Sequence, residues 1–503
     1  MAVSLIFSGL ITSTTSEAET TAIEDSVVKI FSTVVYPDPF RPWSKSDARE
    51  ISGSGVIIAG RRILSNAHVV QYARQVQVQF NQDGAKYFAT VEGISPDMDL
   101  AVLKLDDMKP LESRQPLQLM HSLPHIKDAV VAYGYPTGGS SLSITKGVVS
   151  RIEFVPYSDC AAGLRIQIDA AVNPGNSGGP AMVGDKMTGL VFSHLNNAQN
   201  IGYIIPAEEI ELFLNDIADG HYDGKPFWNG DMASTLENPA MRDFLKLDKS
   251  VDGLVVFDVD RRSRANPLRK WDVITRAGDF SVDGQGMVKL GENLRVSVEY
   301  LFAKLVTNGT IPLTIWRDGK ELNVRFPVFG RYPALFQHLN GAYPSYFIYG
   351  PISFSTVTKE LVAGMTQANM LLSLLYWNSP LVNRYTDLPR FDGESLVAIT
   401  CPFFPHKIMK GYPDLTGQVV KSVNGTAISN LVHLVKVLRN SKEDFIDIEI
   451  ETKDQTHLIF RRTEIEAATE EILANNGIRS RGSPEILAIW NAKAPLSPGH
   501  VGH

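Results

Sequence analysis

The amino-acid sequence predicts a mainly β N-terminal domain followed by two smaller domains that each combine strands with helices. Short alternating segments separated by glycines predict the first domain, and an order of elements that recurs in the C-terminal half predicts the other two. With 503 residues, 44% of them apolar and 20% charged, the chain has the length of about three domains and the composition of a globular protein.

Residues 25–222 are expected to form the β domain. Apolar and polar residues alternate in Val76–Phe80 and in Leu164–Ile168, as they do on half-buried strands. Many short strands separated by glycine turns favour an antiparallel barrel or sandwich. An apolar helical stripe with Pro206 in its first turn is predicted to close the domain at Gly220, where a linker begins.

Two copies of one α+β module are predicted in residues 231–329 and 330–465. Each copy has a strand, an apolar helical stripe and a second strand, with an Asp-Gly or Asn-Gly hairpin turn. An aromatic-rich segment, residues 332–377, is expected to be an insertion in the second copy. Residues 466–503 are expected to form a C-terminal helix and a loose tail.

Residues 1–24 are predicted to be a targeting or disordered segment. An apolar stretch precedes Ser16 and Ala18, which give the small-x-small pattern of a signal-peptide cleavage site and favour export to a periplasm. No Lys or Arg precedes Lys29, so the basic start of a signal peptide is missing. An organelle, either mitochondrion or chloroplast, is the alternative compartment.

Charge, hydropathy and cysteine content exclude several classes of protein. Lys and Arg number 48 and Asp and Glu 55, which gives a net charge of −7, and no basic run suggests a nucleic-acid binder. No apolar run reaches the length of about 20 residues that a membrane span needs. Cys160 and Cys401 are too few for a disulfide scaffold, and we expect two buried free thiols rather than one long-range bridge.

The segment Gly175-Asn176-Ser177-Gly178-Gly179 carries the strongest indication of chemistry. A serine hydroxyl becomes a nucleophile when a base removes its proton, and the oxyanion that it creates needs backbone N–H donors. Glycines on both sides allow the tight backbone that exposes the hydroxyl and aims those amides. Taken alone, such a segment is equally well explained as a glycine-rich turn with an unused serine.

Two further segments supply partners for this serine. His68 follows a predicted buried strand at Arg62–Leu64, and Asp99 stands at the start of the apolar strand Leu100–Leu103. The chain order His, Asp, Ser is that of the chymotrypsin arrangement on a β framework, whereas α/β-hydrolases have the order Ser, Asp, His. Asp97 competes for the carboxylate role, but Asp99 adjoins the buried run where an acid that orients an imidazole should be held.

The sequence lacks the motifs of metal-dependent and nucleotide-binding enzymes. The sequence has no His-Glu-x-x-His, and its remaining histidines show no ligand spacing with cysteines or acids, so no metal site is predicted. The pair Gly53-x-Gly55 has no third glycine for a dinucleotide loop, and no Gly-Lys-Ser/Thr motif occurs. No cofactor is therefore expected.

Together these motifs resemble those of the Do-like (HtrA/Deg) serine proteases, which have the chymotrypsin fold. Six short segments carry the likeness: Gly53-Ser54-Gly55-Val56-Ile57, Leu64-Ser65-Asn66-Ala67-His68-Val69-Val70, Asp99-Leu100-Ala101-Val102-Leu103-Lys104, Gly134-Tyr135-Pro136, Gly175-Asn176-Ser177-Gly178-Gly179-Pro180 and Gly202-Tyr203-Ile204-Ile205-Pro206. The resemblance implies a double β-barrel protease domain followed by two PDZ-like domains, as in the plant Deg proteases and their bacterial two-PDZ relatives.

The resemblance also implies a role for each site residue. His68 would be the general base and acid, Asp99 would hold its tautomer, and Ser177 would be the nucleophile. The backbone of Gly175, Asn176 and Ser177 would form the oxyanion hole, with the N–H groups of the first and last as donors.

A specificity pocket is implied as well, lined by Val191, Ser193 and Ile201. No acid occurs in residues 189–193 or 201–205 to bind a basic side chain, so we expect a small to medium aliphatic preference. The first module lacks the usual Gly-Leu-Gly-Phe-type carboxylate loop. Peptide-terminus binding and a purely structural or assembly role therefore carry about equal weight, and the structural role is favoured for the second module.

The function implied is that of an ATP-independent serine endopeptidase of protein quality control, which cleaves unfolded or damaged proteins through an acyl-enzyme. The alternative is a protease-fold chaperone or peptide-binding protein that does not cleave. The complete set of His68, Asp99, Ser177 and Gly175 favours the first. The likeness implies a homotrimer or a higher multiple. Natural substrates and the activating signal are not specified by the sequence.

Overall fold

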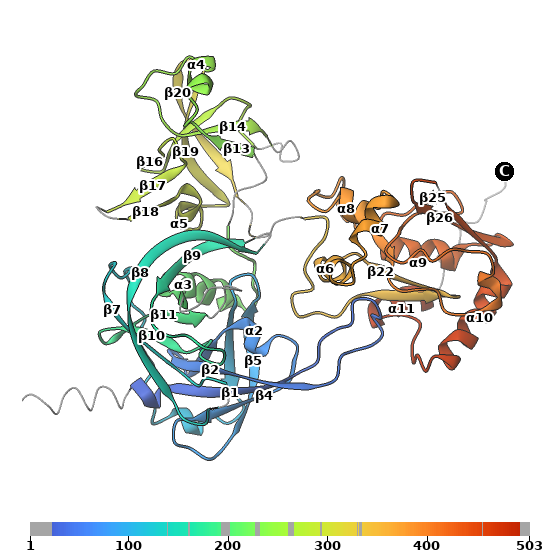
Figure 1. Ribbon diagram of the computed structural model, residues 1–503, viewed down its shortest axis with the longest axis horizontal. Helices are drawn as coiled ribbons and strands as arrows, with labels where there is room; N and C mark the ends of the chain where they lie inside the picture. Colours follow the sequence, from blue (N-terminus) through green and yellow to red (C-terminus); the bar gives the residue numbers. More distant parts are fainter. Residues whose placement is uncertain are drawn as a thin grey trace, which may run out of the picture. The chain divides into compact units, whose positions relative to one another are not determined.

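The computed structural model describes residues 23–137, 139–158, 161–192, 202–226, 232–259, 266–291, 294–328, 330, 334–454 and 456–492. Contacts between residues divide the chain into two compact units, formed by residues 1–34 with 49–332 and by residues 35–48 with 333–503. The second unit therefore contains a short segment from near the N-terminus, which is blue in Figure 1. Most of the predicted targeting segment and Cys160 lie outside the described residues.

Two closed six-stranded barrels form most of the first unit (Figure 1). The first barrel has the strand order β1 (Val27–Val34), β2 (Arg49–Ile58), β3 (Arg62–Ser65), β6 (Leu100–Leu105), β5 (Tyr87–Ser95) and β4 (Ala73–Phe80). Val76, Val78 and Phe80 point into its core from β4, because alternate residues of a strand share one face. The short helix α2 (Ala67–Val70) follows β3.

The second barrel has the order β10 (Pro180–Val183), β11 (Lys186–Phe192), β12 (Gly202–Pro206), β9 (Ala161–Ile168), β8 (Ser143–Ser158) and β7 (Ala129–Gly134). Helix α3 (Ala207–Asp216) then follows, with Pro206 at its N-cap and the 3-10 turn η2 (Ile217–Asp219) at its end. Gly220 stops it in the left-handed region, with φ 90°. The predicted double-barrel, mainly β fold class is thus confirmed.

The first module pairs its strands in the order β13 (Met232–Thr235), β14 (Leu254–Asp258), β15 (Val273–Ala277), β19 (Thr310–Arg317) and β20 (Lys320–Pro327). Its other elements are α4 (Pro239–Phe244), β16 (Phe280–Ser281), β17 (Met287–Leu290), β18 (Leu294–Ser297), η3 (Val298–Leu301) and α5 (Phe302–Leu305). The predicted turn at Asp318 and Gly319 has φ values of 51° and 78°, which suit a tight hairpin. An ion pair between the partly buried Arg317 and the buried Asp272, at 2.6 Å, fixes this hairpin to the residue before β15.

The second unit contains a seven-stranded sheet. Its strands are β21 (Tyr346–Tyr349), β22 (Ile352–Thr356), β23 (Val397–Ile399), β24 (Val419–Val423), β26 (Phe445–Glu451) and β27 (His457–Arg461), with β25 (Thr426–Ala427) paired to β24. Its helices are α6 (Lys359–Gln367), α7 (Leu371–Tyr376), α8 (Pro380–Asn383), η4 (Lys407–Met409), α9 (Leu431–Asn440), α10 (Arg462–Asn475) and α11 (Pro484–Asn491).

Two expectations about this unit need correction. Residues 332–377, expected as an insertion, supply the first two strands of the sheet and bury Phe347 and Phe354 in its core. Part of the segment expected to be a loose tail forms α11, whose Ile486 is buried in the same core. Both segments are integral because their aromatic and aliphatic side chains fill the space between the sheet and α9.

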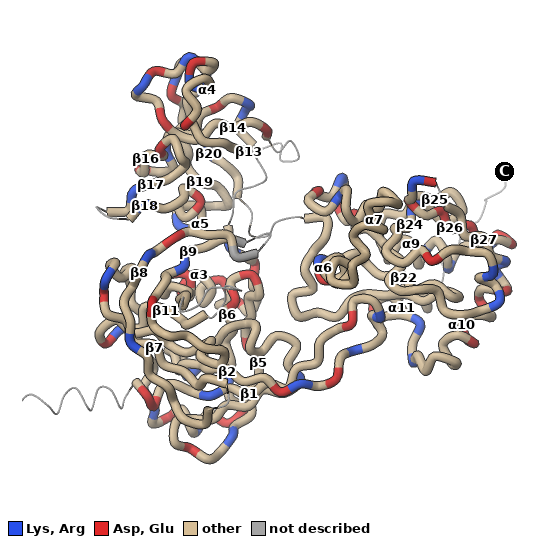
Figure 2. The backbone as a smooth tube through the Cα atoms, in the orientation of Figure 1, with Lys and Arg blue, Asp and Glu red and all other residues tan. Residues whose placement is uncertain are grey.

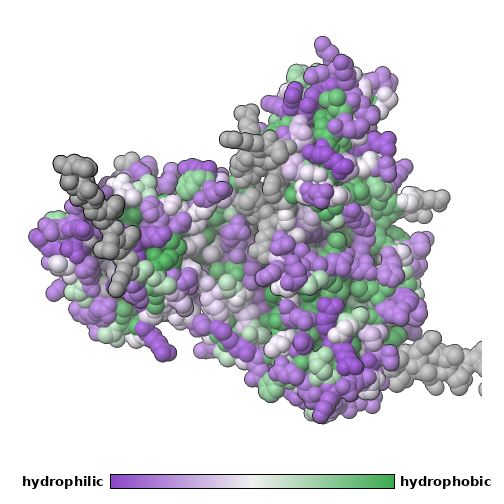
Figure 3. Space-filling model, turned by 180° about the vertical axis from the view of Figure 1, so that it is seen from behind, coloured by the Kyte–Doolittle hydropathy of each residue, from purple (hydrophilic) through white to green (hydrophobic). Residues whose placement is uncertain are grey.

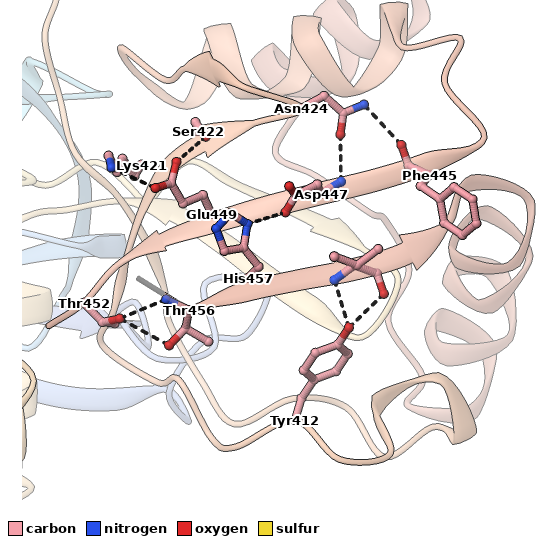
Figure 4. Close-up of polar contacts among 11 residues, drawn as sticks. Tyr412, Lys421, Ser422, Asn424, Phe445, Asp447, Glu449, Thr452, Thr456 and His457 are labelled. Atoms are coloured by element: carbon pink, nitrogen blue, oxygen red, sulfur yellow. Dashed lines mark hydrogen bonds and ion pairs between the residues drawn. The ribbon is translucent and has the colours of Figure 1, made fainter. Parts of the chain in front are cut away.

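Polar contacts link the strands β24, β26 and β27 of this sheet (Figure 4). Glu449 accepts hydrogen bonds from Lys421 and Ser422 at 2.8 Å each, and His457 Nδ1 lies 2.8 Å from the Asp447 carboxylate. These are cross-strand pairs, which link neighbouring strands on a solvated face. Basic and acidic residues are interspersed in both units (Figure 2), and hydrophobic areas lie between hydrophilic ones on the face drawn in Figure 3.

Candidate active site

His68 lies in α2, directly after β3. The neighbouring side chains of Ala67, Val69 and Val70 are buried, so the helix is fixed against the first barrel. The side chain of His68 is 48% exposed. The imidazole is therefore held by a rigid backbone and remains accessible to a substrate.

Asp99 orients this imidazole. Its Oδ2 and Oδ1 lie 2.8 and 3.0 Å from His68 Nδ1, and Oδ1 also accepts the backbone N–H of His68 at 2.8 Å. Asp99 has a left-handed φ of 59°, and its carbonyl oxygen accepts a hydrogen bond from Asn66 Nδ2 at 2.9 Å. Because Nδ1 faces the carboxylate, Nε2 is the ring nitrogen that can accept a proton.

The pKa of the His68 imidazole reflects two opposed effects. Burial lowers this pKa, but the hydrogen bond and the negative charge of Asp99 outweigh burial and raise the pKa above its usual value. The charged imidazolium is therefore stabilised, which is what a catalytic base requires once it has taken up a proton.

Ser177 lies in the loop between β9 and β10 and is almost fully buried. Gly175 and Gly178 flank it with φ values of 99° and 87°. A Cβ on Gly175 would lie 2.5 Å from the carbonyl oxygen of Tyr135, and one on Gly178 would lie 2.1 Å from that of Ser54. Only glycine fits at either position, as the sequence pattern predicts.

Strand β2 contacts both the helix that carries His68 and the loop that carries Ser177. A Cβ on Gly53 would lie 2.7 Å from Val69 in α2 and 3.4 Å from the carbonyl oxygen of Ser177. The next residue, Ser54, donates its N–H to that same carbonyl oxygen at 2.8 Å and its hydroxyl to the Gly175 carbonyl oxygen at 2.7 Å. The helix and the loop thus meet at two adjacent residues of one strand.

The backbone amides before the serine have different roles. Asn176 donates its N–H to the Asn173 carbonyl oxygen at 3.0 Å within a turn. The Pro174 carbonyl oxygen accepts the N–H of Thr137 at 2.7 Å. Because C=O and N–H point in opposite directions across a trans peptide, the N–H of Gly175 points away from Thr137.

Val191 is buried in β11 and fixes the end of the serine loop through its backbone. Its N–H donates to Gly179 at 2.8 Å, and its carbonyl oxygen accepts the N–H of Gly178 at 3.0 Å. Ser193 and Ile201, the other residues expected in the specificity pocket, lie outside the described residues.

Sequence reasoning gave no role to Ser54, Ser65 and Asn66. All three are fully buried, and Ser65 Oγ donates to the Ser54 carbonyl oxygen at 2.7 Å, so they form a polar layer beneath the site. The sequence signal that could have indicated this layer is the presence of polar residues beside apolar strand segments. Buried polar groups need hydrogen-bond partners, so such residues are candidates for a polar network.

Among the described residues, no group of three or more His, Cys, Asp or Glu side chains could hold a metal ion. No helix in the same part of the chain is long and apolar enough to span a membrane. Cys401 is buried and free, and burial raises the pKa of its thiol to about 11.

Two regions of the chain match known families. Residues 53–188 match the trypsin-like peptidase domain, and residues 336–485 match the PDZ domain. A solved structure described as the HtrA-type protease AlgW with tripeptide is 25% identical, with a TM-score of 0.49, and the match covers 63% of this chain and 97% of that one.

Two curated proteins of Arabidopsis thaliana are similar over most of the chain. Protease Do-like 2, chloroplastic, is 33% identical over 469 residues, which cover 92% of this chain and 75% of that protein. Protease Do-like 4, mitochondrial, is 32% identical over 460 residues, which cover 91% and 84%. The extent and identity of these matches show that the chain is a serine endopeptidase of the Do-like (HtrA/Deg) family, whose members act in protein quality control.

Proposed function

We propose that this endopeptidase cleaves peptide bonds with His68 as general base and acid, Asp99 as the orienting carboxylate and Ser177 as the nucleophile. The observation that carries the assignment is the Asp99 carboxylate on His68 Nδ1, at 2.8 and 3.0 Å. A second support is that the histidine helix and the serine loop both contact Gly53, the residue before Ser54.

In the first half of the reaction, His68 Nε2 takes the proton of the Ser177 hydroxyl as its oxygen attacks the substrate carbonyl carbon. The imidazolium, stabilised by Asp99, then gives that proton to the leaving amine, and an acyl-enzyme remains. In the second half, a water loses a proton to His68 and attacks the ester. Collapse of the second tetrahedral intermediate returns the proton to Ser177.

The oxyanion of each tetrahedral intermediate would be bound by the N–H groups of Gly175 and Ser177. The orientation of the Gly175 peptide, anchored through Pro174 to Thr137, supports this choice. Asn176 would shape the loop and would not donate to the oxyanion, because its N–H is used in a turn with Asn173.

The proposed substrates are unfolded or damaged proteins that present small to medium aliphatic side chains. The absence of acids in residues 189–193 and 201–205 supports this preference, since a basic side chain would find no partner there. We further propose a homotrimer or a higher multiple, and a PDZ-like role for residues 231–329, both on the likeness to the family.

A fluorophosphonate probe tests the catalytic assignment directly, since it labels only an activated serine. The native chain and the variant Ser373→Ala, which removes an exposed serine in α7, should be labelled equally. Ser177→Ala should not be labelled and should not cleave casein. Labelling of Ser177→Ala would assign the nucleophile elsewhere, and an unlabelled native chain would favour a protein that binds without cleaving.

A further inference from the structure

Residues 35–48, here called the strap, leave the first barrel at the end of β1 and return to it at the start of β2. Val34 and Arg49 are the last residue pair between these two strands. The contacts of the strap assign it to the second unit, together with residues 333–503. A segment of the protease domain is therefore built into the unit that contains the PDZ domain.

The strap has an ordered shape of its own. Ser46 donates its N–H to the Tyr36 carbonyl oxygen at 2.9 Å, and the Asp38 carboxylate accepts the N–H groups of Phe40 and Arg41 at 2.9 and 3.1 Å. This is a hairpin closed by an Asx turn. A preorganised loop loses less conformational entropy on binding than a flexible one, so the strap is suited to be a ligand.

Trp43 is the first of two apolar anchors. Its ring centroid lies 5.4 Å from that of Phe404 and 6.2 Å from that of Tyr346. It packs against a cluster of buried side chains from several elements of the second module, here called the PDZ module: Tyr346, Ile348, Phe404, Ala468, Ile472, Leu473 and Ile478. A large aromatic ring set into such a cluster is typical of the residues that dominate binding energy.

Phe40 is the second anchor and packs against a separate buried cluster that includes Phe336, Leu361 and Met365. A Cβ on Gly364 in α6 would lie 3.1 Å from the Phe40 ring and 3.5 Å from Pro39. The helix therefore approaches the strap so closely that a glycine, which is unfavourable inside a helix, is the residue that leaves room for Phe40.

Two contacts of Tyr343 with the strap lie beside these anchors. The Tyr343 hydroxyl donates to the Val35 carbonyl oxygen at 2.7 Å, and the Lys45 ammonium lies 4.3 Å from the centroid of the same tyrosine ring. Two partly buried aromatic anchors, each packed on a buried cluster and flanked by polar contacts, are the arrangement expected of a specific binding surface.

The strap is also close in sequence to the catalytic loop. Strand β2 begins at Arg49, one residue after the strap, and Ser54 lies five residues, or about 16 Å of extended strand, further on. Ser54 is hydrogen-bonded to Ser177, Gly175 and Tyr135 around the serine loop, and to Ser65 in the polar layer beneath it. A displacement at the start of β2 would therefore reach the serine loop along one rigid strand.

We propose that the PDZ module is the receptor for the strap of its own chain, and that this contact, transmitted along β2, positions the serine loop for catalysis. The activity part rests on the proposed function of Ser177. The ligand class that the module recognises is thus a preorganised hairpin with two aromatic anchors.

Full-length variants test the binding. Trp43→Ala and Phe40→Ala remove one anchor each, Gly364→Ala crowds Phe40 from the module side while favouring the helix, and Tyr376→Ala removes an exposed aromatic ring as a matched control. Hydrogen exchange of the strap, measured by mass spectrometry, should be slow in the native chain and the control. It should be faster in the three other variants. A strap that stays protected in all three would overturn the proposal.

The same preparations test the coupling. Probe labelling of Ser177 and kcat/KM on a short aliphatic peptide should fall by about tenfold or more in the three variants and change less than about twofold in the control. Full activity with an unprotected strap would overturn the coupling. If the native chain neither labels nor cleaves, the proposed function fails, while the exchange data still report on the strap.

A synthetic peptide of residues 35–48, carrying a fluorophore, separates the strap of the same chain from other occupants. It should bind Trp43→Ala, whose own strap has lost an anchor, and should not bind the native chain, whose receptor surface is filled. Equal binding to both proteins would show that the surface is open in the native chain and would overturn the proposal.

Discussion

The contact between His68 and Asp99 is made by one carboxylate that bonds both the ring and the backbone of the histidine. Asp99→Asn should lower kcat by about 10⁴-fold, because an amide can hold the imidazole in the wrong tautomer. Asp97→Asn is the control and should have a mild effect. Steady-state kinetics with circular dichroism of both variants measures this, and a larger loss in Asp97→Asn would reassign the orienting acid.

The raised pKa of His68 predicts the pH dependence of the reaction. A base works only when unprotonated, and a raised pKa keeps the proton bound to a higher pH, so kcat/KM should rise with pH through a midpoint above about 6.5. Removal of the Asp99 charge should move this midpoint to lower pH in Asp99→Asn. A pH–rate profile of both proteins decides the matter, and an unchanged midpoint would contradict it.

Among the elements, α3 is joined to the segment after it by a buried ion pair. Lys225 Nζ lies 2.6 and 2.9 Å from the carboxylate of Glu209, which also accepts the N–H of Leu164. Lys225→Met would leave a buried carboxylate without its cation and should lower the free energy of unfolding by about 3–5 kcal/mol.

The control for this loss is the exposed pair of Arg61 and Glu112, where Arg61→Met should cost about 0–1 kcal/mol. Urea unfolding followed by tryptophan fluorescence compares the two variants. The double variant Lys225→Met with Glu209→Gln should regain part of the loss, and failure to regain any would point to packing of the lysine stem instead.

At the scale of the whole molecule, two truncated chains can be compared. A chain that ends at Gly224 and one that ends at Pro226 both lack the partners of Phe40 and Trp43, so both expose these rings. Only the longer chain keeps Lys225 and its ion pair with Glu209. The longer chain should be the more stable one. Both should cleave a short aliphatic peptide more slowly than the full chain and lose more activity on casein. Full activity of either on casein would exclude a role for the C-terminal modules.

The contact between His68 and Asp99 was predictable from sequence because its signals are local. Asp99 adjoins the buried strand β6 and His68 the end of β3, so each motif fixes its own backbone. The strap and α11 could not be predicted in this way. Trp43 packs against side chains that are distant in sequence, and Ile486 is buried by such side chains. No periodicity in their own segments specifies those partners.

The strap has a consequence for the synthesis of the chain. Trp43 leaves the ribosome about 300 residues before Tyr346, and at about 5–20 residues per second this interval lasts about 15–60 s. During that time β1 and β2 can pair while the hydrophobic tip between them has no partner. The nascent protease domain therefore displays two aromatic rings that a chaperone can bind, and the ribosome has to complete the last third of the protein before the first is finished.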